Sequence, residues 1–268
     1  LGWSVSTVSW RQDEIPWGHF DAVIIRSTWD YWDDLGAFLS VLEKIDRASR
    51  LANPLQLVRW NYRKTYMRDL ASRGVKIVPT LFPESVAPDS FGGWFGQHQC
   101  DELVIKPVVG ANGDDAYRVS KEAGRDRLEW IANRFRNKTA LVQPFMPNIL
   151  CEGEYSLFYF NGEFSHAIVK VPAGGEFRSQ EEHGAEIVAV EPEERLRRRG
   201  RLALEAIDAA PLYARIDFVR DGNGDFVLME QELIEPSLYL RMHAAAPERF
   251  ARAIDRWFSG MARSHNVN

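Results

Sequence analysis

Cysteine is scarce in this chain, and so are long apolar runs. Only two cysteines occur among its 268 residues, and neither Cys100 nor Cys151 has the spacing of a metal site or a histidine-rich context for covalent catalysis. A disulfide framework is therefore excluded, and we expect a reducing, cytoplasmic environment. No apolar run approaches the ~20 residues that span a membrane, and no signal peptide is visible.

A basic surface stripe is also missing. The chain has 33 lysines and arginines against 38 acidic residues, for a formal net charge of −5, whereas nucleic-acid binding needs a basic stripe. The one basic run, 195–201, follows glutamates in an expected helix and is better explained as a solvated helix face. A hydrophobic content of 45% predicts a substantial core divided over two or three lobes. Because the chain opens at Leu1 without methionine, we expect a first strand to precede it.

The most informative stretch is 214–237, in which two β-prone runs flank Asp-Gly-Asn-Gly. This pattern is typical of an antiparallel hairpin. Pairing across the turn predicts the opposed pairs Arg220–Asp225, Asp217–Leu228 and Arg215–Glu230. Opposed residues, and residues two apart on one strand, share a sheet face. One face is therefore predicted to carry Arg215, Asp217, Glu230 and Glu232, and the other Ile216, Phe218, Val227 and Met229.

The acidic face of this hairpin is typical of a metal site. Three carboxylates beside one arginine repel one another unless a cation lies among them. Oxygen-only ligands favour a hard metal such as Mg²⁺, usually shared with phosphates. We interpret the hairpin as a metal–phosphate platform, although a surface hairpin with alternating charges explains this stretch equally well. A calcium loop does not, because Phe226 stands where an EF-hand needs glycine and the flanks read as strands.

The N-terminal part reads as a βα unit. Residues 21–26 are an apolar run typical of a buried parallel strand, and 37–48 have helical periodicity. The loop 26–31 follows the carboxyl end of the strand, where open α/β sheets bind ligands. Arg26 or Thr28 could therefore contact a substrate, although anchoring this loop explains them equally well.

Two lysines stand in different patterns. Lys64 lies in an expected helix over 60–72 that Gly74 ends, where a lysine is most often solvated. Lys106 ends an expected strand over 103–107, and the small-residue loop after it leads into a further strand. Such a flap can close its backbone N–H groups over phosphates, although a plain hairpin loop with an exposed lysine has the same pattern. It is not a Walker loop, because neither Gly-Lys-Ser/Thr nor a helix follows.

The rest of the chain alternates short elements with loops. We expect strands over 75–79, 140–145, 155–160 and 163–171, and helices over 128–135, 193–208 and 247–258. Asn161-Gly162, between two of these strands, is a strong hairpin signal. Residues 83–96, rich in proline, glycine and serine, read as a loop. The polar loop 172–184 fits an active-site lid as well as a loose surface loop.

Several short motifs follow one another in a specific order. They are the helix lysine, Val-Ile-Lys-Pro with its glycine loop, Gln-Pro-Phe-Met, Glu-Gly-Glu-Tyr-Ser, Lys170, Arg178, Arg-Ile-Asp and Met-Glu-Gln-Glu. Over residues 53–243 this order resembles the ATP-grasp superfamily, in its glutathione-synthetase and D-alanine–D-alanine-ligase branch. The Ser-Thr-Trp-Asp-Tyr stretch near the start resembles a bacterial subgroup that includes the ligase closing O-ureido-D-serine to D-cycloserine.

The resemblance implies a mixed α+β and α/β ATP-grasp fold, in which an N-terminal α/β lobe and two α+β lobes clasp ATP. The implied lobes are 1–60, 61–142 with the phosphate loop, and 143–268 with the metal site. The implied ATP-binding residues are Lys64, Lys106, Gly110, Asn112, Gly113, Gln143, Phe145, Met146, Glu154 and Met229. In this set the lysines bind phosphates, 143–146 hold adenine, and Glu154 meets the ribose.

The resemblance also implies catalytic and metal-binding roles. Lys170 and Arg178 would lie near the transferred phosphate and the substrate, and Arg215 would stabilise the tetrahedral intermediate. The implied ligands of magnesium, with manganese as an alternative, are Asp217, Glu230 and Glu232. The third ligand is usually asparagine in this family, so Glu232 departs from the pattern.

The implied activity is ATP-dependent carboxylate–amine ligation through an acyl phosphate, with ADP and phosphate as products. Phosphorylation turns a carboxylate oxygen into a leaving group, after which an amine can attack. We expect a small-molecule carboxylate and amine substrate, with cyclisation of O-ureido-D-serine as the first specific expectation. A glutathione-synthetase-like or peptide-tagging ligase joining two molecules is one alternative. A catalytically silent ATP-binding protein is another, against which the retained lysines and acids argue. A homodimer is the default expectation.

Overall fold

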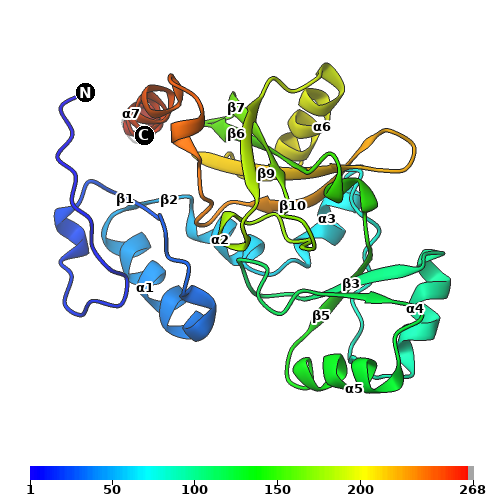
Figure 1. Ribbon diagram of the computed structural model, residues 1–268. Helices are drawn as coiled ribbons and strands as arrows, with labels where there is room; N and C mark the ends of the chain where they lie inside the picture. The colour runs from blue at the N-terminus through cyan, green and yellow to red at the C-terminus, as the bar shows by residue number, and fades with distance from the viewer. Residues whose placement is uncertain (265–268) are drawn as a thin grey trace.

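The computed structural model describes residues 1–264 and contains three sheets (Figure 1). The strands are β1 (Ala22–Ile24), β2 (Arg50–Ala52), β3 (Glu102–Pro107), β4 (Tyr117–Ser120), β5 (Ala140–Pro144), β6 (Glu154–Phe160), β7 (Glu163–Val171), β8 (Glu186–Val190), β9 (Tyr213–Arg220) and β10 (Phe226–Glu232). The helices are α1 (Leu35–Ala48), α2 (Leu55–Asn61), α3 (Tyr66–Ser72), α4 (Ser90–His98), α5 (Arg125–Arg134), α6 (Glu194–Glu205) and α7 (Ala246–Ser264). Short 3-10 turns complete the described chain.

The three sheets form separate layers of the molecule. β1 and β2 make a parallel pair, β4-β3-β5 make a three-stranded sheet, and β10-β9-β6-β7-β8 make a five-stranded sheet. In Figure 1 the parallel pair lies beside α1, the three-stranded sheet lies near α4 and α5, and the five-stranded sheet lies near α6. The lobe boundaries at 60 and 142 remain a proposal, and β5 spans the second of them. Within residues 1–264 no helix is both long and apolar enough to cross a membrane.

The predicted βα unit at the N-terminus is confirmed. β1 leads through a loop over 25–30 and the 3-10 turn Tyr31–Asp34 into α1, and it pairs in parallel with β2. The Asp34 side chain accepts a hydrogen bond from the Ala37 N–H at 3.0 Å and so caps the first turn of α1. Phe38, Leu42 and Ile45 lie on one stripe of this helix and are buried against the small sheet and its loops.

Buried Asn53 joins the N-terminal lobe to the five-stranded sheet. Its Nδ2 donates to the carbonyls of Tyr213, at 2.9 Å, and Leu233, at 2.7 Å, and its Oδ1 accepts from the Leu212 N–H at 2.6 Å. The Tyr213 hydroxyl donates to the Ile25 carbonyl at 2.9 Å. These contacts hold the carboxyl end of β1 beside the loop that follows β10.

Two sequence predictions near the three-stranded sheet are wrong. The helix expected over 60–72 is broken between α2 and α3, so Lys64 lies in the connecting turn rather than in a helix. Gly74, at φ +84°, does end α3 as predicted. The loop expected over 83–96 contains α4, because Phe91 and Trp94 bury one face of it and this packing outweighs the low helix propensity of its glycines.

The strand expected over 75–79 is reduced to one bridge, and both predicted hairpins form. Ile77 pairs only with Leu228. Asn161 and Gly162 turn the β6–β7 hairpin with φ of +50° and +83°, as a tight two-residue turn requires.

The β9–β10 hairpin has a register different from the predicted one. Its opposed pairs are Phe226–Arg220, Val227–Val219, Leu228–Phe218, Glu230–Asp217, Gln231–Ile216 and Glu232–Arg215, with an irregularity between Leu228 and Glu230. This bulge adds one residue, Met229, to β10 and reverses the facing of the residues before it. The predicted partition is therefore wrong for Val227 and Met229, which lie with Val219 and not with the core residues Ile216 and Phe218.

Candidate active site

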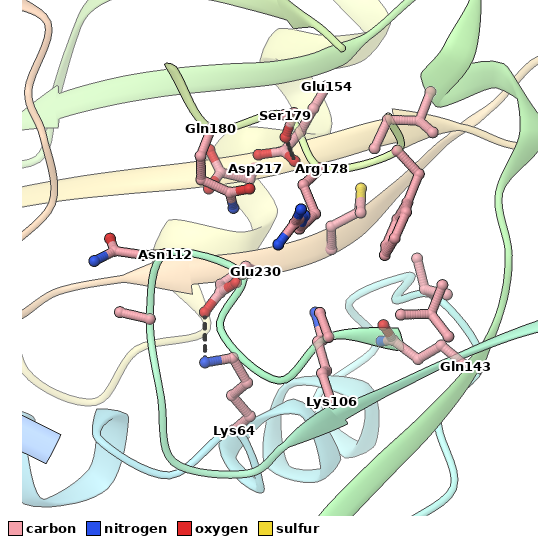
Figure 2. Close-up of a pocket in the computed structure, with 18 of the residues that line it drawn as sticks. Lys64, Lys106, Asn112, Gln143, Glu154, Arg178, Ser179, Gln180, Asp217 and Glu230 are labelled. Atoms are coloured by element: carbon pink, nitrogen blue, oxygen red, sulfur yellow. Dashed lines mark hydrogen bonds and ion pairs between the residues drawn. The ribbon is translucent and has the colours of Figure 1, made fainter. Parts of the chain in front are cut away.

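A pocket opens between the three-stranded and five-stranded sheets, and most predicted site residues meet there (Figure 2). Its walls include every predicted site residue except Lys170: Lys64, Lys106, Gly110, Asn112, Gly113, Gln143, Phe145, Met146, Glu154, Arg178, Arg215, Asp217, Met229, Glu230 and Glu232. Arg215 and Asp217 are only 8% and 1% exposed. The charges on β9 therefore do not belong to a surface hairpin.

One end of the pocket is apolar. Phe145 and Met146, directly after β5, cluster there with Met229. Gln143 is buried, and its Nε2 donates to Thr80 Oγ1 at 2.9 Å, which fixes the orientation of its amide. This end can hold a flat apolar ring against a wall that still offers polar groups at its edge.

Several walls of this pocket were not predicted from the sequence. They are Val78, Val104, Ile149, Phe177, Ser179 and Gln180, together with small residues of the loop after β3. Val104 had a usable signal, because it precedes Lys106 by two positions on β3 and so shares its face. Phe177, Ser179 and Gln180 lie in the loop 172–184, which the sequence indicated only as one that fits a lid or a surface loop. The others reach the pocket from loops, whose paths depend on tertiary contacts.

Three cations surround the middle of the pocket. Figure 2 shows Lys64, Lys106 and Arg178 pointing toward one space from opposite walls. Lys64 Nζ donates to the Gly110 carbonyl at 2.6 Å and lies 3.0 Å from Glu230 Oε1. Burial lowers the pKa of Lys106. The negative charge of Glu230 opposes this shift, and the positive charge of Lys64 adds to it. A polyanion such as a triphosphate would satisfy this concentration of positive charge.

The loop after β3 and the predicted lid after β7 touch each other over this space. A Cβ on Gly113 would lie 3.0 Å from Arg178 Cδ and 3.1 Å from Gln180 Oε1. His183 on the lid lies 3.2 Å from the Asn112 carbonyl. Arg178 Nε and Gln180 Oε1 are buried and have no partner among the described residues. The two loops therefore cover the cationic space and leave polar atoms available to a ligand.

Arg215 lies between two of the three predicted metal ligands. Its Nε donates to both carboxylate oxygens of Asp217 at 3.1 Å, and its Nη2 pairs with Glu232. Ser156 Oγ donates to Asp217 Oδ1 at 2.5 Å. Burial raises the pKa of Glu232 to about 7, and the charges of Glu230 and Asp217 act in the same direction against Arg215.

Glu230 is engaged by different cations. Burial acts to raise its pKa, but the charges of Lys64 and Lys106 outweigh burial and hold the pKa of Glu230 at about 2. The predicted acids thus lie together on one face, but lysine and arginine occupy the places between them. In the hairpin turn itself, Asp221 and Asp225 bind Lys76 Nζ at 2.7 Å and 3.0 Å, so a lysine occupies the position between these acids.

Lys170 lies behind the pocket wall rather than in it. Its side chain is 3% exposed, it pairs with Glu154, and its Nζ is 3.8 Å from Asp217 Oδ1. Burial acts to lower the pKa of Lys170, but Asp217 and Glu154 raise it above its ordinary value. Ser179 also donates to Glu154. The structure thus places Lys170 beside two acids that do line the pocket, and its role near the transferred phosphate stays a prediction.

The acids fit a hard cation by chemistry but are not assembled around one. Among the described residues no group of three acidic, histidine or cysteine side chains has a metal-binding arrangement. The donor set of Asp217, Glu230 and Glu232 is all carboxylate, as magnesium prefers, and burial with like charge opposes ionisation of Glu232. A divalent cation would relieve that repulsion once the carboxylates turn from Arg215 and Lys64.

Comparisons with known proteins match nearly the whole chain. Residues 1–53 match the N-terminal domain of D-cycloserine synthetase, and residues 94–207 match the ATP-grasp domain of prokaryotic glutathione synthetase. The cycloserine biosynthesis protein DcsG of Streptomyces lavendulae is 29% identical over 95% of this chain and 89% of that protein.

Solved structures agree with these matches. The crystal structure of D-cycloserine synthetase DcsG superposes with a TM-score of 0.85 at 28% identity, over 96% of this chain and 90% of that one. The D-alanine–D-alanine ligase of Bacillus anthracis complexed with ATP has a TM-score of 0.67 at 15% identity, over 92% and 82% of the two chains, which shows a shared fold. The predicted ATP-grasp fold is confirmed, and these matches show that the chain is a ligase with this fold.

Proposed function

We propose that this ligase closes O-ureido-D-serine to D-cycloserine at the expense of ATP, as a step of antibiotic biosynthesis. The observation that carries the specific reaction is the extent of the likeness to D-cycloserine synthetase. It includes residues 1–53 of the N-terminal lobe as well as the nucleotide-binding lobes. A general ATP-grasp domain would account for the second part but not for the first.

The pocket has a suitable region for each part of the nucleotide that this reaction needs. The apolar end by Phe145 and Met146 suits adenine, and Glu154 lies on the wall where the ribose is expected. Lys64, Lys106 and Arg178 surround the space proposed for the phosphates. The unpartnered Nε of Arg178 is available to a phosphate oxygen.

The chemistry follows from the order of these groups. The substrate carboxylate attacks the terminal phosphorus, the bond to the bridging oxygen breaks, and ADP leaves. The nitrogen bonded to the side-chain oxygen then attacks the acyl carbon and gives up its proton, an oxyanion forms beside Arg215, and phosphate leaves as the ring amide closes. Water also cleaves the carbamoyl group from that nitrogen, with release of carbon dioxide and ammonia, because D-cycloserine lacks this group. Asp217, Glu230 and Glu232 would hold magnesium, or alternatively manganese, which when bound neutralises charge on the phosphates.

Two other activities remain candidates for the same pocket. A ligase joining two separate molecules has the same nucleotide site, and the peptide-bound ligase PsnB shares the fold with a TM-score of 0.62 at 14% identity. A silent ATP-binding protein would need no substrate site. We also propose a homodimer and a cytoplasmic location, which light scattering and fractionation would test.

The test is substrate-dependent release of ADP by the purified chain with magnesium and ATP. With O-ureido-D-serine alone we expect ADP and D-cycloserine in equal amounts, the latter detected by mass spectrometry. ADP release that needs a separate carboxylate and amine would favour the two-molecule ligase. ATP binding without ADP release across the substrate panel would overturn the ligation proposal for this chain.

A further inference from the structure

A second group of polar side chains lies next to Arg215 but outside the walls of the nucleotide pocket. It comprises Arg26, Thr28 and Glu235, and we name it the Arg26–Glu235 cluster. Arg26 and Thr28 follow β1, and Glu235 follows β10. The cluster therefore forms where the carboxyl end of a parallel strand meets the end of the metal-site hairpin, a place where open α/β sheets bind ligands.

The loop after β10 is held from both sides. Arg26 Nη2 donates to the Pro236 carbonyl at 3.1 Å, and Trp29 Nε1 donates to the Glu235 carbonyl at 2.9 Å. On the other side Arg215 Nη1 lies 3.5 Å from the Ser237 carbonyl. These contacts fix the backbone, so they explain how the loop is anchored without using the Glu235 carboxyl.

Several polar atoms of the cluster lack partners. Arg26 Nη1 and Thr28 Oγ1 are buried and make no hydrogen bond with any described residue. Glu235 is 7% exposed and its carboxyl accepts from its own backbone N–H, but among the described residues no side chain donates to it. Buried polar groups are nearly always paired in folded proteins, so a group of unpaired ones needs an explanation.

The charges of this cluster are complementary but separate. The negative charge of Glu235 acts on the Arg26 guanidinium, yet the two side chains form no ion pair. Burial raises the pKa of Glu235 well above its usual value, and the nearby charge of Glu232 acts in the same direction. A ligand that brought a cation to Glu235 and an oxygen acceptor to Arg26 would satisfy both groups.

We propose that the Arg26–Glu235 cluster binds the amino-acid end of the substrate. Glu235 accepts hydrogen bonds from an ammonium group next to the carboxylate that is activated beside Arg215. Arg26 Nη1 and Thr28 Oγ1 donate to an oxygen farther along the same molecule. The substrate class is thus a zwitterionic amino acid with a second hydrogen-bond acceptor, and this assignment rests on the proposed ligase function.

The test compares O-ureido-D-serine with its analogue that carries hydrogen in place of the ammonium group. For the natural protein we expect kcat/KM to be about 100-fold lower with the analogue, since a buried charge then loses its partner. Glu235→Gln should lower kcat/KM for O-ureido-D-serine by a similar factor, mainly through KM, and leave the analogue and the KM for ATP nearly unchanged. Glu235→Asp should recover part of the loss. Glu248→Gln is the matched control, because this exposed glutamate pairs with Arg252 alone among the described residues.

Binding separates this inference from the proposed function. Calorimetry with a non-hydrolysable ATP analogue measures the affinity of both compounds for the natural protein and for Glu235→Gln, after thermal unfolding has shown that the variant folds. Ammonium-dependent binding that Glu235→Gln removes supports the cluster even if no ADP is released. Equal affinity and equal turnover of the two compounds would overturn the proposed role of the Arg26–Glu235 cluster, without contradicting the proposed ligase function.

Discussion

Asp217→Asn is predicted to destabilise the protein as well as to inactivate it. Asp217 is 1% exposed and accepts from Ser156 at 2.5 Å and from Arg215 at 3.1 Å, with Lys170 at 3.8 Å. Asparagine keeps the shape but removes the charge that two buried cations face. Breaking a buried ion pair costs about 3–5 kcal/mol. We expect about 3 kcal/mol, at the lower end of that range, because each cation retains a second carboxylate, at Glu154 or Glu232.

Denaturant unfolding without nucleotide measures this loss, and ADP release measures the loss of activity. A change of about 3 kcal/mol corresponds to a fall in melting temperature of roughly 6–12 °C for a chain of this size. Asp208→Asn is the matched control, because this aspartate is 79% exposed and, within the part of the chain that the structure describes, pairs with Arg73 alone. We expect its substitution to lower the free energy of unfolding by less than about 1 kcal/mol. If Asp217→Asn unfolds like that control, the buried charge network does not stabilise the fold. If it retains most of its turnover, Asp217 is not part of the metal-binding set.

Three further predictions concern other parts of the molecule. Gly113→Ala should lower kcat about tenfold more than Gly175→Ala. Both glycines have positive φ, but a Cβ would contact lid side chains, those of Arg178 and Gln180, at Gly113 and not at Gly175. Equal losses of kcat in steady-state kinetics would contradict that contact. Burial holds the pKa of His166 at about 4 against an ordinary 6.5. The unfolded chain therefore takes up the His166 proton first as pH falls, so this residue's contribution to the free energy of unfolding should fall by about 2 kcal/mol between neutral pH and pH 5. Urea unfolding measures it as the difference in pH dependence between the natural protein and His166→Gln, because the raised pKa values of Glu232 and Glu235 act in the opposite direction in both. Gly200→Ala should lower the free energy of unfolding by about 2 kcal/mol, because its Cβ would lie 2.3 Å from the Tyr159 hydroxyl. The double variant with Tyr159→Phe should recover part of this stability in the same unfolding assay.

Local signals predicted much of the fold. The stripe of apolar residues in α1 and the Asn161-Gly162 turn depend on periodicity and on two positive φ angles, both of which a short segment encodes. The helix α4 could not be predicted in this way. Its glycines favour a loop, and only burial of Phe91 and Trp94 against the three-stranded sheet makes the helix stable. Tertiary packing overrides local propensity there.

The residue types of the site could be predicted from the sequence, but not which side chains line the pocket and which lie behind its wall. The order of the motifs predicted that Lys64, Lys106 and Arg215 lie around one site, and all three line the same pocket. Nothing in the order distinguishes Lys170, which supports the wall from behind, from a lysine that faces a ligand. Alternation along β7 gives the side of the sheet, but the depth of a side chain depends on which neighbours cover it. That information resides in contacts between distant segments, here with Glu154 and Asp217.

The bulge at Met229 determines which residues of β10 face the pocket. On β9, Val219, Asp217 and Arg215 alternate regularly on the pocket side. A regular β10 would oppose them with its even-numbered residues and place Leu228 on that side. The extra residue reverses the facing, so that Leu228 joins the core and Val227 and Met229 lie at the apolar end.

Glu230 and Glu232, beyond the bulge, remain opposite Asp217 and Arg215. The face therefore changes from apolar to charged over a few residues, in the same order as the base and phosphates of a nucleotide. Without the inserted residue, a strand that carries Glu230 and Glu232 on this face would place Leu228 there instead of Val227 and Met229. The bulge therefore shapes the wall of the pocket, although Met229 carries no charge.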